Sequence, residues 1–290
     1  MTARIVHSIE ELRAGLSAVR RAGVGVGLVP TMGALHAGHR SLIEQSVRET
    51  GCTVVSVYVN PIQFNDATDY KSYPRTLGDD ARLCGDAGAE IVFAPSIEEM
   101  YPQPQRAFVE VEELTQGLCG AFRPGHFRGV ATVVLKLFNI VQPDIAYFGQ
   151  KDAQQLAVIR RMAADLNVPL RIVGVPIVRE ADGLAMSSRN RHLSPAERQA
   201  APSIYHALLH VRARIAEGVL DPAQATREAS AEMERQGLRV EYLEIVDPDS
   251  MQRVEKISGQ VLAATAAWLG STRLIDNIVC APLSHAPARK

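Results

Sequence analysis

The chain has few aromatic residues, almost no net charge and no long apolar run. Aromatic residues make up 5% of its 290 residues, and the formal net charge at pH 7 is −1. This balance argues against a general nucleic-acid binder, which normally carries a strong basic excess. No apolar run approaches the roughly 20 residues that a membrane-spanning helix needs, and residues 1–10 lack a signal-peptide core. We therefore expect a protein of the cytoplasm.

Cysteine is also scarce. The four cysteines are widely separated and form no CxxC pair, which fits a reduced, cytoplasmic setting. Cys52 and Cys84 are expected to be buried thiols beside a strand and a helix, the usual environment of a free cysteine. At 290 residues the chain is long enough for one large domain or two smaller ones, and its 47% of hydrophobic residues fits a folded α/β protein.

The first part of the chain alternates apolar runs with amphipathic segments, which is typical of a parallel sheet covered by helices. The expected strands are Val24–Val29, Thr53–Val59, Glu90–Phe93, Asp144–Phe148 and Leu170–Val175. The expected helices between them are Ser41–Thr50, Asp79–Ala87, Val130–Val141 and Ala153–Leu166. This pattern predicts an α/β fold with a Rossmann-like domain over residues 1–180.

A second, smaller α+β region is expected over residues 181–290. The Asp-Gly pair within Val178–Ala185 predicts a short hairpin, and a charged, serine-rich linker follows it to Leu193. Ser194 and Pro195 are typical of a helix start, and two helical stretches continue to about Gln236. Three short strands are then expected at Val240–Val246, Val261–Trp268 and Thr272–Val279.

Two histidines and two glycines follow the first expected strand, in the stretch Pro30–His39. They lie at a strand-to-helix turn, where ligands bind in α/β sheets. Gly33 and Gly38 let the backbone approach a ligand closely, and the following helix start favours an anion such as phosphate. His36 and His39 can add donors to that anion. Metal ligation and an ordinary surface position are the alternatives.

Other polar groups follow other expected strands. Asn60 and Gln63 lie at the same sheet edge, where amides can orient a small polar ligand, although turn capping also explains them. Asp79 and Asp80 begin a helix, so they either cap it or contact Mg²⁺. Lys151 at a helix start opposes the helix dipole, which suggests contact with a phosphate, unless it is simply solvated.

The linker carries two hydroxyl groups and two guanidinium groups between Met186 and Arg191. Arginine suits a triphosphate because its planar donors match phosphate oxygens, whereas a solvated, flexible linker is the alternative. All these polar clusters fall at the carboxyl ends of strands or at the boundary between the two regions. We therefore expect them to surround one nucleotide.

These residues closely resemble the pantoate–β-alanine ligase family, within the wider group of nucleotide-binding enzymes with an HxGH turn and a KMSKS-like loop. The resemblance extends over nearly the whole chain. The matching stretches are Met32–His39, Asn60–Phe64, Tyr73–Thr76, His126–Phe138, Gly149–Gln155, Met186–Arg189 and Arg273–Asn277.

The resemblance implies a Rossmann-like domain and a small carboxy-terminal lid that begins with the SSRN loop, in a homodimeric cytoplasmic enzyme. It implies that (R)-pantoate is joined to β-alanine while ATP is cleaved to AMP and pyrophosphate. We expect Mg²⁺ to accompany the ATP phosphates. The implied ATP-binding residues are Pro30, Met32, Gly33, Ala34, Leu35, His36, Ala37, Gly38, His39, Gly149, Gln150, Lys151, Asp152, Val178, Met186, Ser187, Ser188 and Arg189.

The resemblance also implies roles for individual residues. Pantoate would contact Gln63, Gln155 and Met32, and β-alanine would contact Gln63. His39 would be the proton donor. From the charge that develops on the phosphates, we assign the catalytic set as His39, His36, Lys151, Ser187, Ser188 and Arg189, with Asp79 or Asp80 at Mg²⁺. The rival interpretations are a nucleotidyltransferase of the same fold, a non-enzymatic nucleotide sensor and a metal-binding protein built on the two histidines.

Overall fold

The computed structural model describes residues 2–65 and 67–283. These form two compact units. The first contains residues up to 112, 123–150 and 158–178, and the second contains 113–122, 151–157 and the chain from 179 onward. The second unit thus takes in two earlier segments, 113–122 and 151–157, in addition to the C-terminal part of the chain. Over the described ranges, every helix is too short or too polar to span a lipid bilayer.

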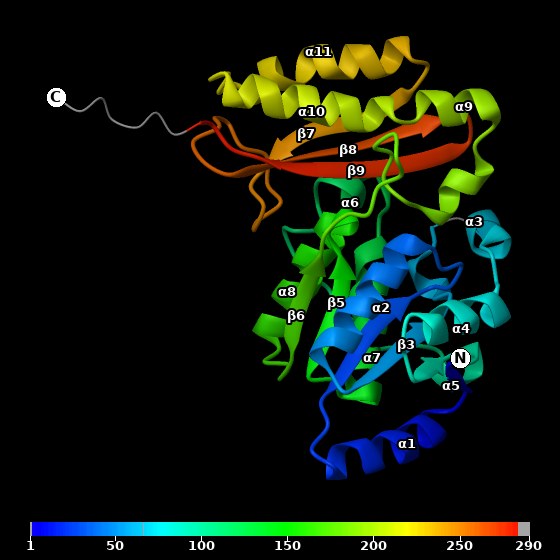
Figure 1. The fold of residues 1–290 in the computed structure, drawn as a ribbon. Helices are drawn as coiled ribbons and strands as arrows, with labels where there is room; N and C mark the ends of the chain where they lie inside the picture. The colour runs from blue at the N-terminus through cyan, green and yellow to red at the C-terminus, as the bar shows by residue number, and fades with distance from the viewer. Residues whose placement is uncertain (1, 66, 284–290) are drawn as a thin grey trace. The chain divides into compact units, whose positions relative to one another are not determined.

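The first unit is built on a six-stranded parallel sheet with the order β1-β4-β3-β2-β5-β6 (Figure 1). Its strands are β1 (Arg4–Val6), β2 (Val26–Thr31), β3 (Cys52–Val57), β4 (Ile91–Phe93), β5 (Ile145–Gly149) and β6 (Arg171–Val175). The chain reverses its direction of travel across the sheet between β2 and β5, the switch point at which α/β folds bind ligands. The prediction of a Rossmann-like parallel sheet is confirmed.

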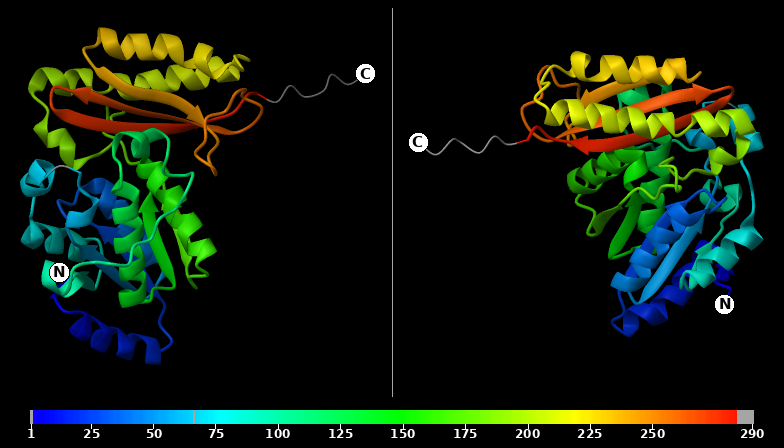
Figure 2. Two further views of the ribbon diagram at one scale, coloured as in Figure 1. Left: turned by 180° about the vertical axis from the view of Figure 1, so that it is seen from behind. Right: turned by 45° about the horizontal axis from the view of Figure 1, so that its top comes forward.

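Helices cover both faces of this sheet, which Figure 1 and the left view of Figure 2 show from opposite sides. The main ones are α1 (Ile9–Arg21), α2 (Ala37–Glu49), α4 (Leu77–Asp86) and α7 (His126–Val141). Helix α2 packs on the central strands and α4 packs beside it, whereas α7 contacts α1 and β2. Shorter elements are η1 (Pro61–Gln63), α3 (Ala67–Ser72) and α5 (Ile97–Met100).

Several boundaries differ from the sequence prediction. Helix α2 begins at Ala37 and not at Ser41, because His36 itself caps it. Strand β1 and helix α1 were not predicted; β1 has only three residues and pairs with β4 at the edge of the sheet. Helix α8 (Ala153–Asp165) follows β5 through the 3-10 turn η2 (Gln150–Asp152).

The second unit has a three-stranded antiparallel sheet made of β7 (Arg239–Val246), β8 (Val261–Leu269) and β9 (Thr272–Cys280). Its helices are α6 (Leu118–Phe122), α9 (Pro195–Ala200), α10 (Ser203–Ala216) and α11 (Pro222–Arg235). Helices α10 and α11 lie along one face of the sheet (Figures 1 and 2). The predicted α+β character of this region is confirmed.

Two local predictions in the second unit have clear outcomes. Ser194 caps α9 in a capping box with Glu197, as its sequence indicates. The predicted hairpin is a tight turn closed by a single antiparallel bridge between Arg179 and Ala185, with no strands on either side. The SSRN segment that follows forms the 3-10 helix η3 (Ser188–His192).

Candidate active site

The histidine turn is the N-terminus of α2. The Nδ1 atom of His36 accepts a hydrogen bond from the Gly38 N–H at 3.1 Å, and Nδ1 of His39 accepts from the His36 N–H at 3.3 Å. The two side chains therefore form a capping box, with histidines in the places usually taken by Ser and Glu. Their ring centroids lie 4.2 Å apart, so the two imidazoles form one cluster at the helix start.

This arrangement fixes which nitrogen of each ring carries the proton. Because Nδ1 of both rings accepts from a backbone N–H, each neutral imidazole has its hydrogen on Nε2. Protonation at Nδ1 would replace an acceptor by a donor that faces another donor. The turn thus provides two Nε2–H donors beside the positive end of a helix dipole, a combination suited to a phosphate.

A buried carboxylate shapes the backbone just before the histidines. Asp80, which is 2% exposed, accepts hydrogen bonds from Leu35 N at 2.8 Å and Ala34 N at 3.2 Å. Gly33 has φ of 83°, and a Cβ there would lie 3.0 Å from an oxygen of Asp80. Both the left-handed backbone and the close approach therefore require glycine. Asp80 thus fixes the backbone of Ala34 and Leu35, which precede the two histidines.

The two aspartates proposed as magnesium ligands have different roles in the structure. Both lie in the first turn of α4, as predicted. Both oxygens of Asp80 are engaged, since the Thr76 hydroxyl also donates to Oδ2 at 3.2 Å, so Asp80 does not fit the role of a magnesium ligand. Asp79 is exposed and pairs with Arg82. Within residues 2–65 and 67–283, no three His, Cys, Asp or Glu side chains cluster closely enough to hold a metal ion.

Gln63 lies next to Met32, which brings together two of the three residues proposed for pantoate. Its Nε2 donates to the Met32 sulfur at 3.0 Å, and its Oε1 accepts from Asn60 Nδ2 at 3.1 Å. Tyr101 in turn donates its hydroxyl to Asn60 Oδ1 at 2.9 Å. Burial raises the pKa of Tyr101 to about 12, so this hydroxyl keeps its proton at neutral pH. The sequence indicated no role for Tyr101.

Gln63 also lines a cavity of about 180 Å³ with His126 and Arg128. His126 donates from Nδ1 to the Gln63 carbonyl at 2.8 Å. The close approach of α7 depends on Gly129, because a Cβ there would lie 2.5 Å from the Ile62 carbonyl oxygen. Gln63 is therefore fixed through both its side chain and its backbone.

The remaining predicted residues of the first unit lie around β5 and β6. Gly149 is the last residue of β5, and Gln150 donates from Nε2 to the Gly174 carbonyl in β6 at 3.4 Å. Val178 follows β6 and is partly buried. Since β2, β3 and β5 are parallel neighbours, the turns that follow them share one edge of the sheet.

The other predicted residues belong to the second unit. Lys151 and Asp152 lie in η2, and Gln155 lies in the first turn of α8. Its neighbour Gln154, for which no role was predicted, is buried and donates to two carbonyls, those of Leu114 and Gly117. The residues Met186, Ser187, Ser188 and Arg189 lead into and begin η3, which Ser187 caps through the Arg189 N–H at 3.3 Å.

Cys52 and Cys84 are buried thiols, as expected. Cys52 and Cys84 are 4% and 0% exposed. Burial raises their pKa values to about 11 and about 12, so they are protonated thiols at neutral pH. This removes the state in which a thiol acts as a nucleophile.

The parallel sheet and the histidine turn at its carboxyl edge define a nucleotide-binding α/β protein of the group with an HxGH turn. The comparison with known sequences narrows this class. A profile of the Pantoate-beta-alanine ligase family matches residues 4–279. The chain therefore belongs to the pantoate–β-alanine ligase family.

Individual relatives agree with this assignment. The chain is 53% identical over 277 residues to the pantothenate synthetase of Heliobacterium modesticaldum. The match covers 95% of this chain and 99% of that protein. The structure is similar to a pantothenate synthetase from Thermus thermophilus, with a TM-score of 0.89, 48% identity and coverage of 95% and 98%. It is also similar to the ligase of Francisella tularensis described as complexed with Beta-gamma ATP and Beta-alanine, with a TM-score of 0.81, 32% identity and coverage of 96% and 97%.

Proposed function

We propose that the protein condenses (R)-pantoate with β-alanine through a pantoyl-adenylate intermediate, giving pantothenate, AMP and pyrophosphate. Family membership over residues 4–279 and the names of the relatives support the overall reaction. The observation that carries the chemistry is the capping box at the start of α2, in which both histidines accept through Nδ1 and therefore carry their hydrogen on Nε2 when neutral. This pair suits a reaction in which negative charge develops on phosphate oxygens.

In the first half-reaction, a carboxylate oxygen of pantoate attacks the α-phosphorus of ATP. The new bond joins oxygen to the α-phosphorus, the bond from that phosphorus to the bridging oxygen breaks, and pyrophosphate leaves. The carboxylate is already ionised at neutral pH, because such groups have a pKa of roughly 4. The step therefore needs donors for the leaving charge and no general base.

We assign the stabilisation of that charge to six side chains. One positioned donor is commonly worth roughly 3 kcal/mol in such a step. His39 is the proposed proton or hydrogen-bond donor to a phosphate oxygen through Nε2, since its Nδ1 accepts in the capping box. The full proposed set is His36, His39, Lys151, Ser187, Ser188 and Arg189.

The proposed ATP site extends over turns in both units. In the first unit it uses Pro30 and Met32–His39, together with Gly149, Gln150 and Val178. In the second unit it uses Lys151, Asp152 and Met186–Arg189. The positive end of the α2 dipole supports the phosphate part of this proposal.

Gln63, Gln155 and Met32 are the proposed contacts of pantoate, and Gln63 is the proposed contact of β-alanine. The Gln63 amide is held by Asn60 on its oxygen side, whereas its NH₂ group donates to the Met32 sulfur. A thioether is a weak acceptor, so this NH₂ group can turn to a carboxylate or hydroxyl at little cost. Gln63 is thus preorganised to bind a polar substrate.

In the second half-reaction, the amine of β-alanine attacks the carbonyl carbon of the adenylate, and AMP leaves. An alkylammonium group has a pKa of about 10, so the amine must lose a proton first. We assign no residue to that proton transfer. Orientation of the two substrates supplies the rate advantage of this step in the proposal.

Mg²⁺ is proposed to enter with ATP, bound mainly by phosphate and water oxygens, as is usual for this ion. When bound, it would neutralise charge on the triphosphate. Of the two aspartates, Asp79 is the one proposed to contact Mg²⁺, because Asp80 already accepts three hydrogen bonds. A homodimer in the cytoplasm, and closure of the C-terminal unit as a lid over the adenylate, complete the proposal.

Pyrophosphate exchange into ATP, measured with and without pantoate, tests this function. We expect exchange only when pantoate is present, and release of AMP only when β-alanine is also added. A nucleotidyltransferase would instead accumulate an adenylylated product, and a nucleotide sensor would bind ATP without any pantoate-dependent exchange. Either result would refute the proposal.

A further inference from the structure

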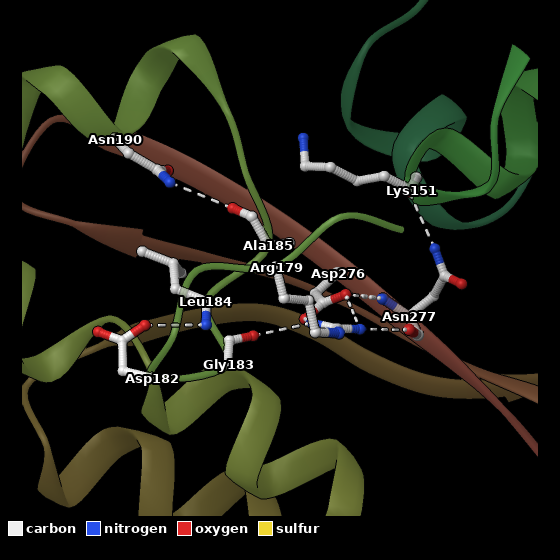
Figure 3. Close-up of polar contacts among 9 residues, drawn as sticks. All are labelled: Lys151, Arg179, Asp182, Gly183, Leu184, Ala185, Asn190, Asp276 and Asn277. Atoms are coloured by element: carbon white, nitrogen blue, oxygen red, sulfur yellow. Dashed lines mark hydrogen bonds and ion pairs between the residues drawn. The ribbon is translucent and has the colours of Figure 1, made fainter. Parts of the chain in front are cut away.

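The backbone carbonyl of Lys151 is held by a side chain that lies far away in the sequence. Asn277, in β9, donates from Nδ2 to the Lys151 oxygen at 2.9 Å, and Asn277 is 7% exposed. Figure 3 shows the Lys151 side chain extending from the turn in a direction away from Asn277. The bond thus fixes the backbone of the lysine and leaves its ammonium group available for a ligand.

A buried ion pair lies next to this contact. Asp276, which is 3% exposed, accepts from two nitrogens of Arg179 at 2.6 Å and 3.0 Å. Its Oδ1 also accepts from the Asn277 N–H at 2.8 Å. Burial raises the pKa of Asp276 above its usual range, and the charges of Arg179 and Lys151 oppose this shift. Charge-assisted, two-pronged bonds of this kind are geometrically exacting.

Arg179 extends the network to the turn that precedes the SSRN loop. Its guanidinium donates to the Gly183 carbonyl at 3.1 Å and lies 3.7 Å from the centroid of the Tyr205 ring. Asn190 then donates to the Ala185 carbonyl at 3.1 Å (Figure 3). Hydrogen bonds therefore link the lysine turn and the middle of β9 to the 179–185 turn, and Asn190 of η3 is bonded to the same turn.

We infer that Asn277 is a positioning residue that presets Lys151, so that the lysine and the Met186–Arg189 segment form one preassembled cationic group of the second unit. The inference rests on the proposed function of Lys151 as a phosphate contact. A cation that is already oriented when ATP binds loses little further freedom, and this lowers the barrier of the chemical step. Asn277 itself need not touch the substrate.

A double-mutant cycle tests this inference. We would measure single-turnover release of pyrophosphate from ATP and pantoate for Asn277→Leu, Lys151→Ala and the double variant. Leucine has a similar size and no donor, so Asn277→Leu should slow release by about 10- to 100-fold. If Asn277 acts through Lys151, adding Asn277→Leu to Lys151→Ala should change the remaining rate by less than about threefold.

Thr265→Val is the matched control. Thr265 is a buried residue of the same sheet whose hydroxyl donates to the Tyr242 carbonyl at 2.8 Å, so its loss costs a comparable hydrogen bond without touching Lys151. The control should lower the melting temperature to a similar degree and leave the rate within about threefold of wild type. Asn277→Ser, which is too short to reach the Lys151 oxygen, provides a second variant in case the leucine does not fit.

Two outcomes would overturn the inference. One is a double variant slowed by the full product of the two single effects, which would show that Asn277 acts independently of Lys151. The other is an Asn277 variant with the same rate as Thr265→Val. A failure of the proposed function would look different, because the wild-type protein itself would then release no pyrophosphate in response to pantoate.

Discussion

Replacing Asp80 by asparagine should loosen the turn that carries the two histidines. Asparagine keeps the shape of the side chain but puts an NH₂ group where one oxygen accepts, so at least one of the donors, Leu35 N or Ala34 N, loses its partner. Ala34 has φ of 51°, a left-handed conformation that is unfavourable for a residue with a Cβ. The turn is therefore free to relax once it is released.

The size of the effect follows from the bonds that are lost. A hydrogen bond to a charged, buried acceptor contributes about 1.5–3 kcal/mol, and a donor left facing another donor adds to that loss. We therefore expect Asp80→Asn to lower the free energy of unfolding by about 2–4 kcal/mol. Misplacing the histidine donors should lower kcat/KM for ATP by about 10- to 100-fold.

Urea unfolding and pantoate-dependent pyrophosphate exchange measure the two effects. Asp79→Asn is the matched control: it changes the adjacent, exposed aspartate and should alter stability by less than about 0.5 kcal/mol. The Mg²⁺ concentration for half-maximal activity should stay the same in Asp80→Asn, since Asp80 holds backbone and not metal. A large shift in that concentration with unchanged stability would refute this reasoning and make Asp80 a magnesium ligand.

Three further predictions concern other parts of the two units. His39→Ala should slow single-turnover release of pyrophosphate by about 10²- to 10³-fold, and an unchanged rate would mean that His39 does not donate to a phosphate. Tyr101→Phe removes the hydroxyl that orients Asn60. It should raise KM for pantoate about 5- to 10-fold, the equivalent of roughly 1 kcal/mol. An unchanged KM in steady-state kinetics would disprove this. Burial works to raise the pKa of Glu241, but hydrogen bonds from Arg273 and Trp268 outweigh it and hold that pKa below its ordinary value of 4.5. Because this pKa is lowered, ionised Glu241 stabilises the fold above pH 4.5, and the stabilisation is lost as the pH falls through the lowered pKa. Glu241→Gln should therefore be less stable than wild type at pH 7, by about 1–3 kcal/mol. That difference should shrink in thermal melts below about pH 4.5, and a constant difference would contradict the assignment.

The central strands and the turns after them were predictable because of local chemistry. Strands β2, β3 and β5 are buried on both faces, so each is a nearly continuous apolar run that ends in Gly, Pro or a polar residue. Helix α9 was predictable from Ser194 and Pro195 for the same reason. Helix α1 was missed although its signals are present: Ser8 caps it, and Leu12 and Leu16 are spaced to share one buried face.

The supports of the candidate site were not predictable from local patterns. Asp80 looked like an ordinary residue at a helix start, and only the packing of α4 beside α2 brings it under Ala34 and Leu35. Tyr101 gave no functional signal, because its partner Asn60 is 41 residues away. From the sequence alone, Asp80 is indistinguishable from a helix-capping residue and Tyr101 from a core residue, because their hydrogen-bond partners are distant in the chain.

The sequence by itself determined where the chain is apolar, where it turns and which polar side chains stand at the strand ends, since these depend on neighbouring residues. The tertiary structure alone decided which distant groups meet, such as Asn277 and the Lys151 carbonyl across 126 positions. A hydrogen bond depends on distance and angle between two atoms, and neither is encoded by the spacing of residues along the chain. Folding has to supply both.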